Sequence, residues 1–263
     1  MLVDNKFFYI SIPRCASTSF HYSCILHNLD IKFVTNSINE DNNKTDFTNI
    51  KKENLMDVIK HGHETLFDLQ KKFGTDYPII SIKRDRYERF YSLFKQLIFD
   101  THRIGAFEVN NFLKNINVNE LFFFKAKDLL NKQARVDKIN DFLFENKLIK
   151  NRVELQDTRI DIGESIIDKE KKIDSYIVNI FEILITPVSF YHHHNKNIIW
   201  FDFKNLNEME KWVSNKINKP FKLENTNSSK DIECNLKLNE EFKNIYNITY
   251  DYFDIVKENN TII

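Results

Sequence analysis

Three short apolar runs, each bounded by polar residues, predict buried strands. They lie within residues 6–12, 77–83 and 197–203 and are rich in Ile, Phe and Tyr, as buried strands are. After each run comes a polar turn and then a segment of helical character, at residues 20–29, 86–100 and 205–216. This alternation indicates an α/β fold in which a central, mostly parallel sheet is flanked by helices.

Helical periodicity predicts several further elements. In residues 86–100 one apolar face is formed by residues three and four apart, namely Phe90, Leu93, Phe94, Leu97 and Ile98. A helix at 66–73 is expected to end at Gly74, because glycine suits a helix C-terminus. Other helices are predicted at 55–60, twice within 118–147, at 171–185 and after the polar loop 224–233. Residues 35–54 are polar and predict an exposed loop. We find no internal repeat and expect one domain over residues 1–263.

Composition excludes several classes of protein. Lys plus Arg and Asp plus Glu each number 38, and this zero net charge argues against a nucleic-acid partner. Only four glycines and four prolines are present, which excludes collagen-like and linker classes. The three cysteines lack a framework spacing, so a reducing compartment is expected. With neither a signal-peptide pattern nor an apolar run of roughly 20 residues, we predict a cytoplasmic protein without a membrane partner.

Two segments combine a cation and hydroxyl groups near the start of a predicted helix. In the first, Arg14 precedes Ser17, Thr18 and Ser19. In the second, Arg84 follows a strand and Ser92 lies about two turns into the next helix. Helix N-termini favour phosphate, and both loops should lie beyond the carboxyl ends of strands, where ligands bind in open α/β sheets. A ligand with two separate phosphates is therefore predicted. The alternatives are a simple helix cap with a surface Arg, and a solvated helix face with an ion pair.

Histidines provide the candidate proton acceptor. His61 and His63 flank Gly62, and His63 is a natural general base because an imidazole titrates near neutral pH. Ordinary loop histidines or a metal pair are the alternatives for this short motif. His192, His193 and His194 are consecutive, so they cannot easily all face one ion, and we predict no metal site there.

The order of these segments resembles one enzyme superfamily. IPRCASTSF at 12–20 resembles the 5′-phosphosulfate loop of sulfotransferases that use 3′-phosphoadenosine-5′-phosphosulfate (PAPS), and SIKRDRYERFYSLF at 81–94 resembles their 3′-phosphate segment. HGHETLFDLQKKFG at 61–74 is similar to a stretch of the heparan sulfate 2-O-sulfotransferase branch. NIIWFDFKNL and ENTNSSKDIE resemble a later strand and the C-terminal cofactor loop, so the matches run from residue 7 to about 256.

The resemblance implies a P-loop-like three-layer fold, PAPS as donor, adenosine 3′,5′-bisphosphate (PAP) as product, and no required metal. It implies His63 as the general base, His61 as a positioning residue and Arg14 as a group that stabilises developing charge. The cofactor-binding residues that it implies are Arg14, Cys15, Ala16, Ser17, Thr18, Ser19, Arg84, Ser92, Asn227, Ser229 and Lys230. The chain departs from the family pattern in having Arg14 for Lys, Cys15 for Thr or Ser, Arg86 for Pro and Lys204 for an acidic residue.

The predicted function is therefore sulfuryl transfer from PAPS to a hydroxyl group of a saccharide, the substrate class of the resembled branch. A tyrosine in a peptide or a small alcohol is the alternative acceptor. An inactive module that binds PAP or a glycan is the alternative of a different class. A nucleotide kinase is disfavoured, because residues 12–20 contain no glycine and the GxxxxGK[ST] pattern is absent. A homo-oligomer would be consistent with the resembled branch.

Overall fold

The computed structural model describes residues 1–34, 63–121, 131–153, 166–193, 195, 197–224, 234 and 236–254. Their contacts group into two compact units. The sheet unit contains Met1–Asp85 and Val188–Ser228, and the helical unit contains Arg86–Pro187 and Ser229–Val256. The single catalytic domain expected over residues 1–263 stays a prediction. The expected loop at 35–54 and the expected helix at 55–60 lie outside the described residues.

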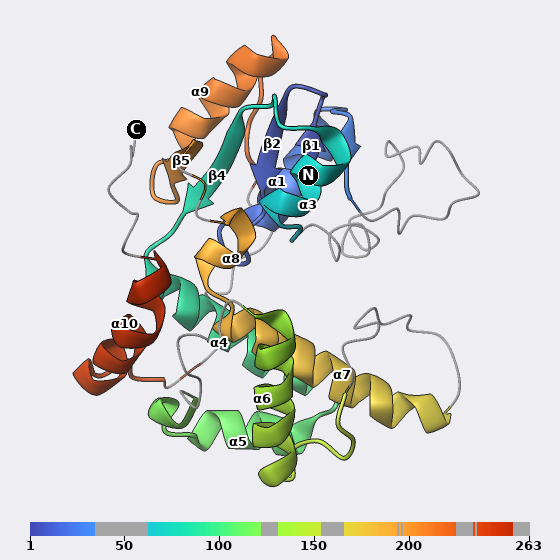
Figure 1. The fold of residues 1–263 in the computed structure, drawn as a ribbon, viewed down its shortest axis with the longest axis vertical. Helices are drawn as coiled ribbons and strands as arrows, with labels where there is room; N and C mark the ends of the chain where they lie inside the picture. Colours follow the sequence, from blue (N-terminus) through green and yellow to red (C-terminus); the bar gives the residue numbers. More distant parts are fainter. Residues whose placement is uncertain are drawn as a thin grey trace. The chain divides into compact units, whose positions relative to one another are not determined.

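The sheet unit is built on an open, five-stranded mixed sheet (Figure 1). Its strands are β1 (Leu2–Val3), β2 (Phe7–Ile10), β3 (Ile31–Lys32), β4 (Ile79–Lys83) and β5 (Ile198–Asp202), in the order β3-β1-β2-β4-β5. β2, β4 and β5 are parallel neighbours, whereas β1 is antiparallel to both β2 and β3. The predicted α/β class is confirmed, and so are the three predicted strands. The antiparallel pairs make the sheet mixed.

A tight hairpin accounts for the antiparallel edge. Asp4 and Asn5 connect β1 to β2 with φ values of 53° and 52°, and the Lys6 amide donates to the Val3 carbonyl at 2.8 Å. Positive φ at both central residues matches the right-handed twist of two paired strands, and Asp and Asn tolerate it. This Asp-Asn pair between apolar residues was the sequence signal for β1, which the strand prediction at 6–12 did not include.

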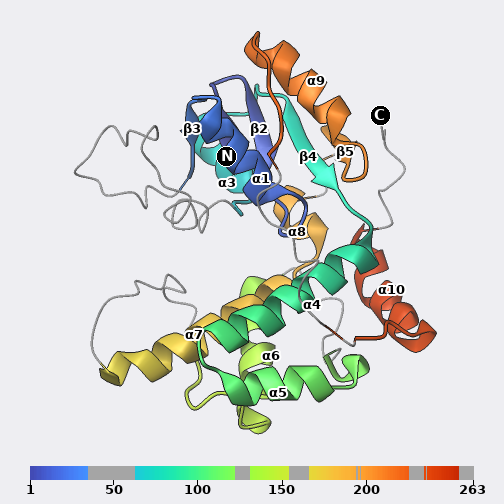
Figure 2. The ribbon, with the colours of Figure 1, turned by 180° about the vertical axis from the view of Figure 1, so that it is seen from behind.

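Side chains along β2 point alternately to the two faces of the sheet, and their contacts identify the helices on one face. Phe7 and Tyr9 point to the same face, where Phe7 contacts Trp212 at 5.2 Å between ring centroids and Tyr9 stacks on Phe20 at 4.0 Å. This face is therefore covered by α1 (Ser17–Leu26) and α9 (Leu206–Ile217). Helix α3 (Leu66–Phe73) lies in front of α1 in Figure 1 and behind it in Figure 2, so it covers the opposite side. The predicted end of α3 is confirmed, because Gly74 is its C-cap with φ of 90°.

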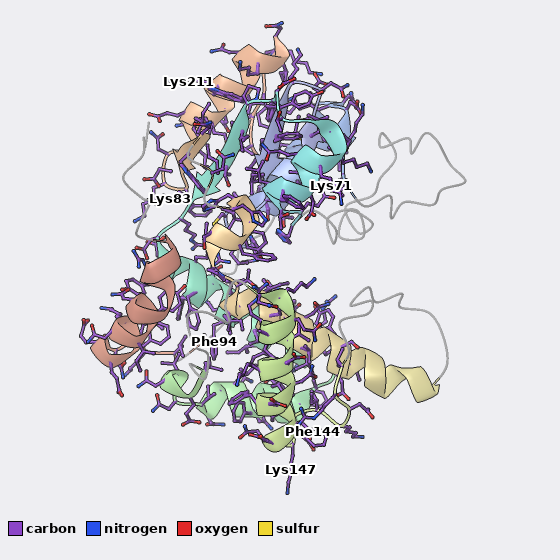
Figure 3. The ribbon with its side chains drawn as sticks, in the orientation of Figure 1. Lys71, Lys83, Phe94, Phe144, Lys147 and Lys211 are labelled. Atoms are coloured by element: carbon purple, nitrogen blue, oxygen red, sulfur yellow. The ribbon has the colours of Figure 1, made fainter. Side chains whose placement is uncertain are left out.

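The helical unit packs its helices around one apolar core (Figure 2). Its elements are α4 (Arg86–Arg103), α5 (Phe107–Asn115), the 3₁₀ helix η2 (Val118–Leu121), α6 (Lys132–Glu145), α7 (Ile166–Ile185) and α10 (Glu240–Asp254). All five residues of the apolar face predicted for 86–100 are buried in this core, and Phe94 is labelled in Figure 3. Among the described residues, no helix combines the length and the apolar character that crossing a membrane requires.

Charged side chains are also buried in the helical unit. Arg135 is completely buried, and its Nε and Nη2 donate to one carboxylate oxygen of Glu182 at 3.0 and 2.5 Å. The hydroxyl of Thr186 donates to the same oxygen at 3.0 Å, and Arg89 donates to the Thr186 carbonyl at 3.4 Å. A buried charge is tolerated only when it is paired and hydrogen-bonded, so this cluster has the organisation of a structural ion pair.

Candidate functional site

The carboxyl ends of β2, β4 and β5 lie at one edge of the sheet, because the three strands are parallel. The segments that follow them begin with Ser11, Arg84 and Phe203, respectively. Figure 3 labels Lys83, the last residue of β4, at this edge. In open α/β sheets this is the edge where ligands bind. The first predicted phosphate loop and Arg84 therefore belong to the same part of the sheet unit.

The loop from β2 to α1 has an unusual backbone. Arg14 and Ala16 both have positive φ, of 66° and 57°, while the loop holds no glycine. The Cys15 amide donates to the Ile12 carbonyl at 3.1 Å, and the Tyr9 hydroxyl lies 3.5 Å from the Cys15 carbonyl. The positive φ of Arg14 belongs to this turn, in which the Cys15 amide is bonded to the Ile12 carbonyl, and the positive φ of Ala16 leads the chain into α1. The loop thus brings Arg14 to the start of a helix, where the first N–H groups and the positive end of the helix dipole suit an anion.

The start of α1 has a composition that suits an anion. Ala16 is the N-cap residue, and its methyl side chain cannot accept a hydrogen bond from the first turn. The first turn contains no acidic residue, so no carboxylate of α1 itself opposes an anion at the positive end of the helix dipole. Ser17 is buried, whereas Thr18 and Ser19 are partly accessible. Of the predicted hydroxyl groups, Thr18 and Ser19 are therefore the more accessible.

Arg84 joins the ends of all three parallel strands. Its guanidinium donates from Nη1 to the carbonyl of Arg14 at 3.1 Å and lies over the ring of Phe203, 4.5 Å from the centroid. The amide of Phe203 in turn donates to the carbonyl of Lys83 at 2.8 Å. The structure thus brings Arg84 to the Arg14 loop, as the two-segment prediction required. Phe203, which supports the guanidinium, was missed by the sequence reasoning.

His63 is held beside the same loop. Its Nδ1 donates to the carbonyl of Ser11 at 2.7 Å, and Ser11 precedes Arg14 by three residues. In a neutral imidazole this hydrogen bond places the remaining lone pair on Nε2. The structure therefore presents His63 in the tautomer that accepts a proton at Nε2.

A buried Ser–His pair supports this arrangement. The Ser11 hydroxyl and His21 Nε2 are hydrogen-bonded at 2.7 Å, and both side chains are fully buried. Burial lowers the pKa of His21 well below its usual range, and the charges of His63 and of the Met1 amino group lower it further. His21 is therefore neutral. Sequence reasoning missed both residues, since only the packing of α1 against the end of β2 brings them together.

The remaining predicted site residues fall into two groups. Ser92 is buried in α4 and belongs to the helical unit, whereas Arg84 belongs to the sheet unit. Ser92 is thus buried in a unit other than that of the Arg14 loop, and its role stays a prediction. Four predicted residues lie outside the described part of the chain, namely His61, Asn227, Ser229 and Lys230. Their roles stay predictions.

The histidine run is not arranged as a cluster. His192 ends α8 (Val188–His192) and its ring lies 5.4 Å from that of Trp200. The ring of His193 instead lies 5.8 Å from that of Phe67, and His194 is outside the described residues. Within the described ranges, no three His, Cys, Asp or Glu side chains gather in a way that would hold a metal ion.

Comparison with protein-family models, with curated proteins and with solved structures finds no match to this chain.

Proposed function

We propose that the protein is a PAPS-dependent O-sulfotransferase whose acceptor is a saccharide hydroxyl. The observation that carries the proposal is the connection from His63 through Ser11 to Arg14. His63 is bonded to the Ser11 carbonyl at 2.7 Å, and the anion-binding loop begins immediately after Ser11. A proton acceptor and an anion site thus share one strand exit, as transfer of a charged group to a hydroxyl requires.

The fold supports the same proposal. A strand, a loop that can bind an anion and a helix follow one another in β2, residues 11–16 and α1, and β2 has a parallel neighbour in β4. Helices on both faces of this parallel part complete the P-loop-like, three-layer arrangement that we propose. The antiparallel β1 and β3 lie at one edge of the sheet, away from the parallel strands β4 and β5.

The residues at the strand exit fit a doubly phosphorylated nucleotide. Arg14 and the start of α1 suit one anionic group, and Arg84, held by the Arg14 carbonyl and Phe203, is a candidate for a second. When bound, PAPS supplies an activated sulfuryl group on a phosphate that leaves as part of the bisphosphate. Arg for Lys at position 14 keeps a positive charge with a wider, planar donor set.

The chain's own groups would act on the two ends of the transfer. Nε2 of His63 accepts the proton of the acceptor hydroxyl while the oxygen of that hydroxyl bonds to sulfur. Arg14 and the loop amides stabilise the negative charge that grows on the leaving phosphate oxygen as the sulfur–oxygen bond breaks. Ser11 holds His63 in the required tautomer through its carbonyl.

The test of the donor site is a thermal shift assay with PAP beside ATP, ADP and AMP. A selective rise in melting temperature with PAP is expected, because a ligand that binds only the folded state stabilises it. A selective PAP shift would justify acceptor screens with PAPS. A larger shift with ATP, or none with PAP, would remove the proposal and favour a kinase or a non-catalytic protein.

The test of the base is His63→Ala. Transfer from PAPS is expected to fall by about 10²–10⁴-fold, the usual contribution of a general base, while the PAP shift stays nearly unchanged. His102→Ala is the control, because His102 is exposed on α4 of the helical unit. Full activity of the His63 variant would contradict the assignment of the base.

A further inference from the structure

A series of ring–ring contacts begins at His63 and continues within the sheet unit. The ring of His63 lies 6.5 Å from that of Tyr191, and Tyr191 lies 5.7 Å from Phe190. Phe190 is 6.3 Å from His193, which is 5.8 Å from Phe67. The rings come from α3 and from the segment that begins with α8, two elements that contact one another. Phe67 follows His63 by only four residues, so the first and last rings of the series are neighbours in the sequence.

The last two rings of the series, those of Phe67 and His193, are exposed to solvent. Phe67 is 59% exposed, although its neighbours Leu66 and Leu69 on α3 are buried. His193 is also exposed, and its backbone is in the left-handed region with φ of 49°. A left-handed residue directly after the last residue of a helix is a common way for the helix to end, and the His193 amide donates to the Ser189 carbonyl at 2.9 Å. The end of α8 thus presents an imidazole beside an exposed phenyl ring.

We infer that Phe67 and His193 form a platform on which the acceptor's sugar ring stacks, with Phe190 as its support. The inference rests on the proposed function, because the platform is placed by its continuity with the candidate base. Phe67 and His193 lie at the exposed end of a series of ring contacts that begins at His63. Its role would be to orient an acceptor hydroxyl toward Nε2 of His63.

The shape and chemistry of the platform favour a saccharide over a tyrosine or a small alcohol. Small aromatic ligands bind in concave sites that bury most of their surface, whereas Phe67 is largely exposed. A pyranose lays its C–H face on an aromatic ring and keeps its hydroxyl groups at its rim, so an open platform suffices. The imidazole of His193 can hydrogen-bond a hydroxyl or a carboxylate at that rim.

The test compares two phenylalanines in matched surroundings. Phe67 and Phe107 are both 59% exposed, and each lies next to a histidine ring, at 5.8 Å from His193 and 5.7 Å from His102, respectively. Binding of a neutral and a uronate-containing oligosaccharide to the PAP-loaded full chain would be measured by saturation-transfer NMR. We expect Phe67→Ala to weaken the affinity for at least one of the two oligosaccharides about five- to tenfold, a typical stacking contribution. Phe107→Ala should leave the affinity for that oligosaccharide unchanged. Phe67→Trp should retain the affinity.

The saccharide titrations of the two alanine variants decide whether the inference holds. Unchanged saccharide binding in Phe67→Ala, or an equal loss in Phe107→Ala, would overturn it. Binding of a tyrosine peptide that depends on Phe67, without saccharide binding, would overturn the assignment to a sugar. The PAP thermal shift of wild type and Phe67→Ala separates the two proposals. If wild type shows no shift, the proposed function fails, and the platform is then supported or rejected by the saccharide titration of the free chain alone.

Discussion

Arg135 of the helical unit and the two basic side chains of the candidate site in the sheet unit are held in different ways. In the helical unit, Arg135 and Glu182 neutralise each other within the core. In the sheet unit, His63 and Arg84 are half-buried, and each donates a hydrogen bond to a backbone carbonyl of the segment that follows β2. Ser81 likewise donates to the Ile10 carbonyl at 2.8 Å. A carbonyl orients a cationic or basic group without neutralising it.

This difference separates structural charge from candidate functional charge. Mutual neutralisation stabilises a core but leaves the pair with little further chemistry. Orientation by the backbone holds a guanidinium or an imidazole in place for another molecule. Burial alone therefore does not identify a site: Arg135 is more deeply buried than Arg84, yet Arg84 is the better candidate for binding a ligand.

The largest expected effect is the loss of the buried ion pair. Glu182→Ala should lower the free energy of unfolding by about 3–5 kcal/mol, because Arg135 would keep an uncompensated buried charge. Chemical denaturation followed by circular dichroism measures this change. Glu240→Ala is the matched control: its ion pair with Lys243 has the same 2.5 Å length as the buried pair, but its side chain is 81% exposed. That variant should change stability by less than about 0.5 kcal/mol. Equal effects of the two variants would contradict the distinction.

The next expected effect concerns ligand affinity. Arg84→Ala should weaken PAP binding by about 2 kcal/mol, or roughly 30-fold, through loss of a charge-assisted contact. Isothermal titration calorimetry measures the affinity. Arg103→Ala serves as control, because the Arg103 side chain is 57% exposed and pairs with Asp100 in the helical unit. Unchanged affinity in the Arg84 variant would reject a phosphate-binding role for this residue.

The smallest effect is a pH dependence in the sheet unit. His21 has a pKa well below its ordinary 6.5 in the folded chain, so below that pH the unfolded chain binds a proton that the folded chain does not. The free energy of unfolding should therefore fall as pH falls, by up to ~1.4 kcal/mol per pH unit. Denaturation at several pH values should show a shallower slope for His21→Phe than for wild type. An unchanged slope would show that His21 does not contribute to acid sensitivity.

Sequence patterns predicted the elements of this fold better than its connections. Helix α4 was predictable because the periodicity of its apolar residues is strong, and α3 because Gly74 marks its end. The antiparallel β1 was missed, since two residues give no periodicity and only the Asp4–Asn5 turn signals them. Register across a sheet depends on contacts between distant segments, so the mixed character of the sheet could not be inferred from local patterns.

The candidate site was predictable in part for the same reason. Arg14, His63 and Arg84 could be proposed from residue type and order. The backbone conformation of Arg14 and Ala16 could not, because non-glycine residues seldom adopt positive φ. Ser11 and His21 could not be identified either, since a Ser after a strand and a His in a helix are individually common. Arg84 and Ser92 belong to different units, and their spacing of eight residues in the sequence does not reveal this.

The glycine-free loop between β2 and α1 has a consequence for the thermodynamics of binding. A glycine-rich loop samples many backbone conformations when empty and loses that entropy when an anion orders it. Here Arg14 and Ala16 have side chains that restrict the empty loop, and Tyr9 contacts it from below. Association should therefore carry a smaller entropic penalty than in a glycine-rich loop. The loop conformation is fixed when the protein folds, before any ligand binds.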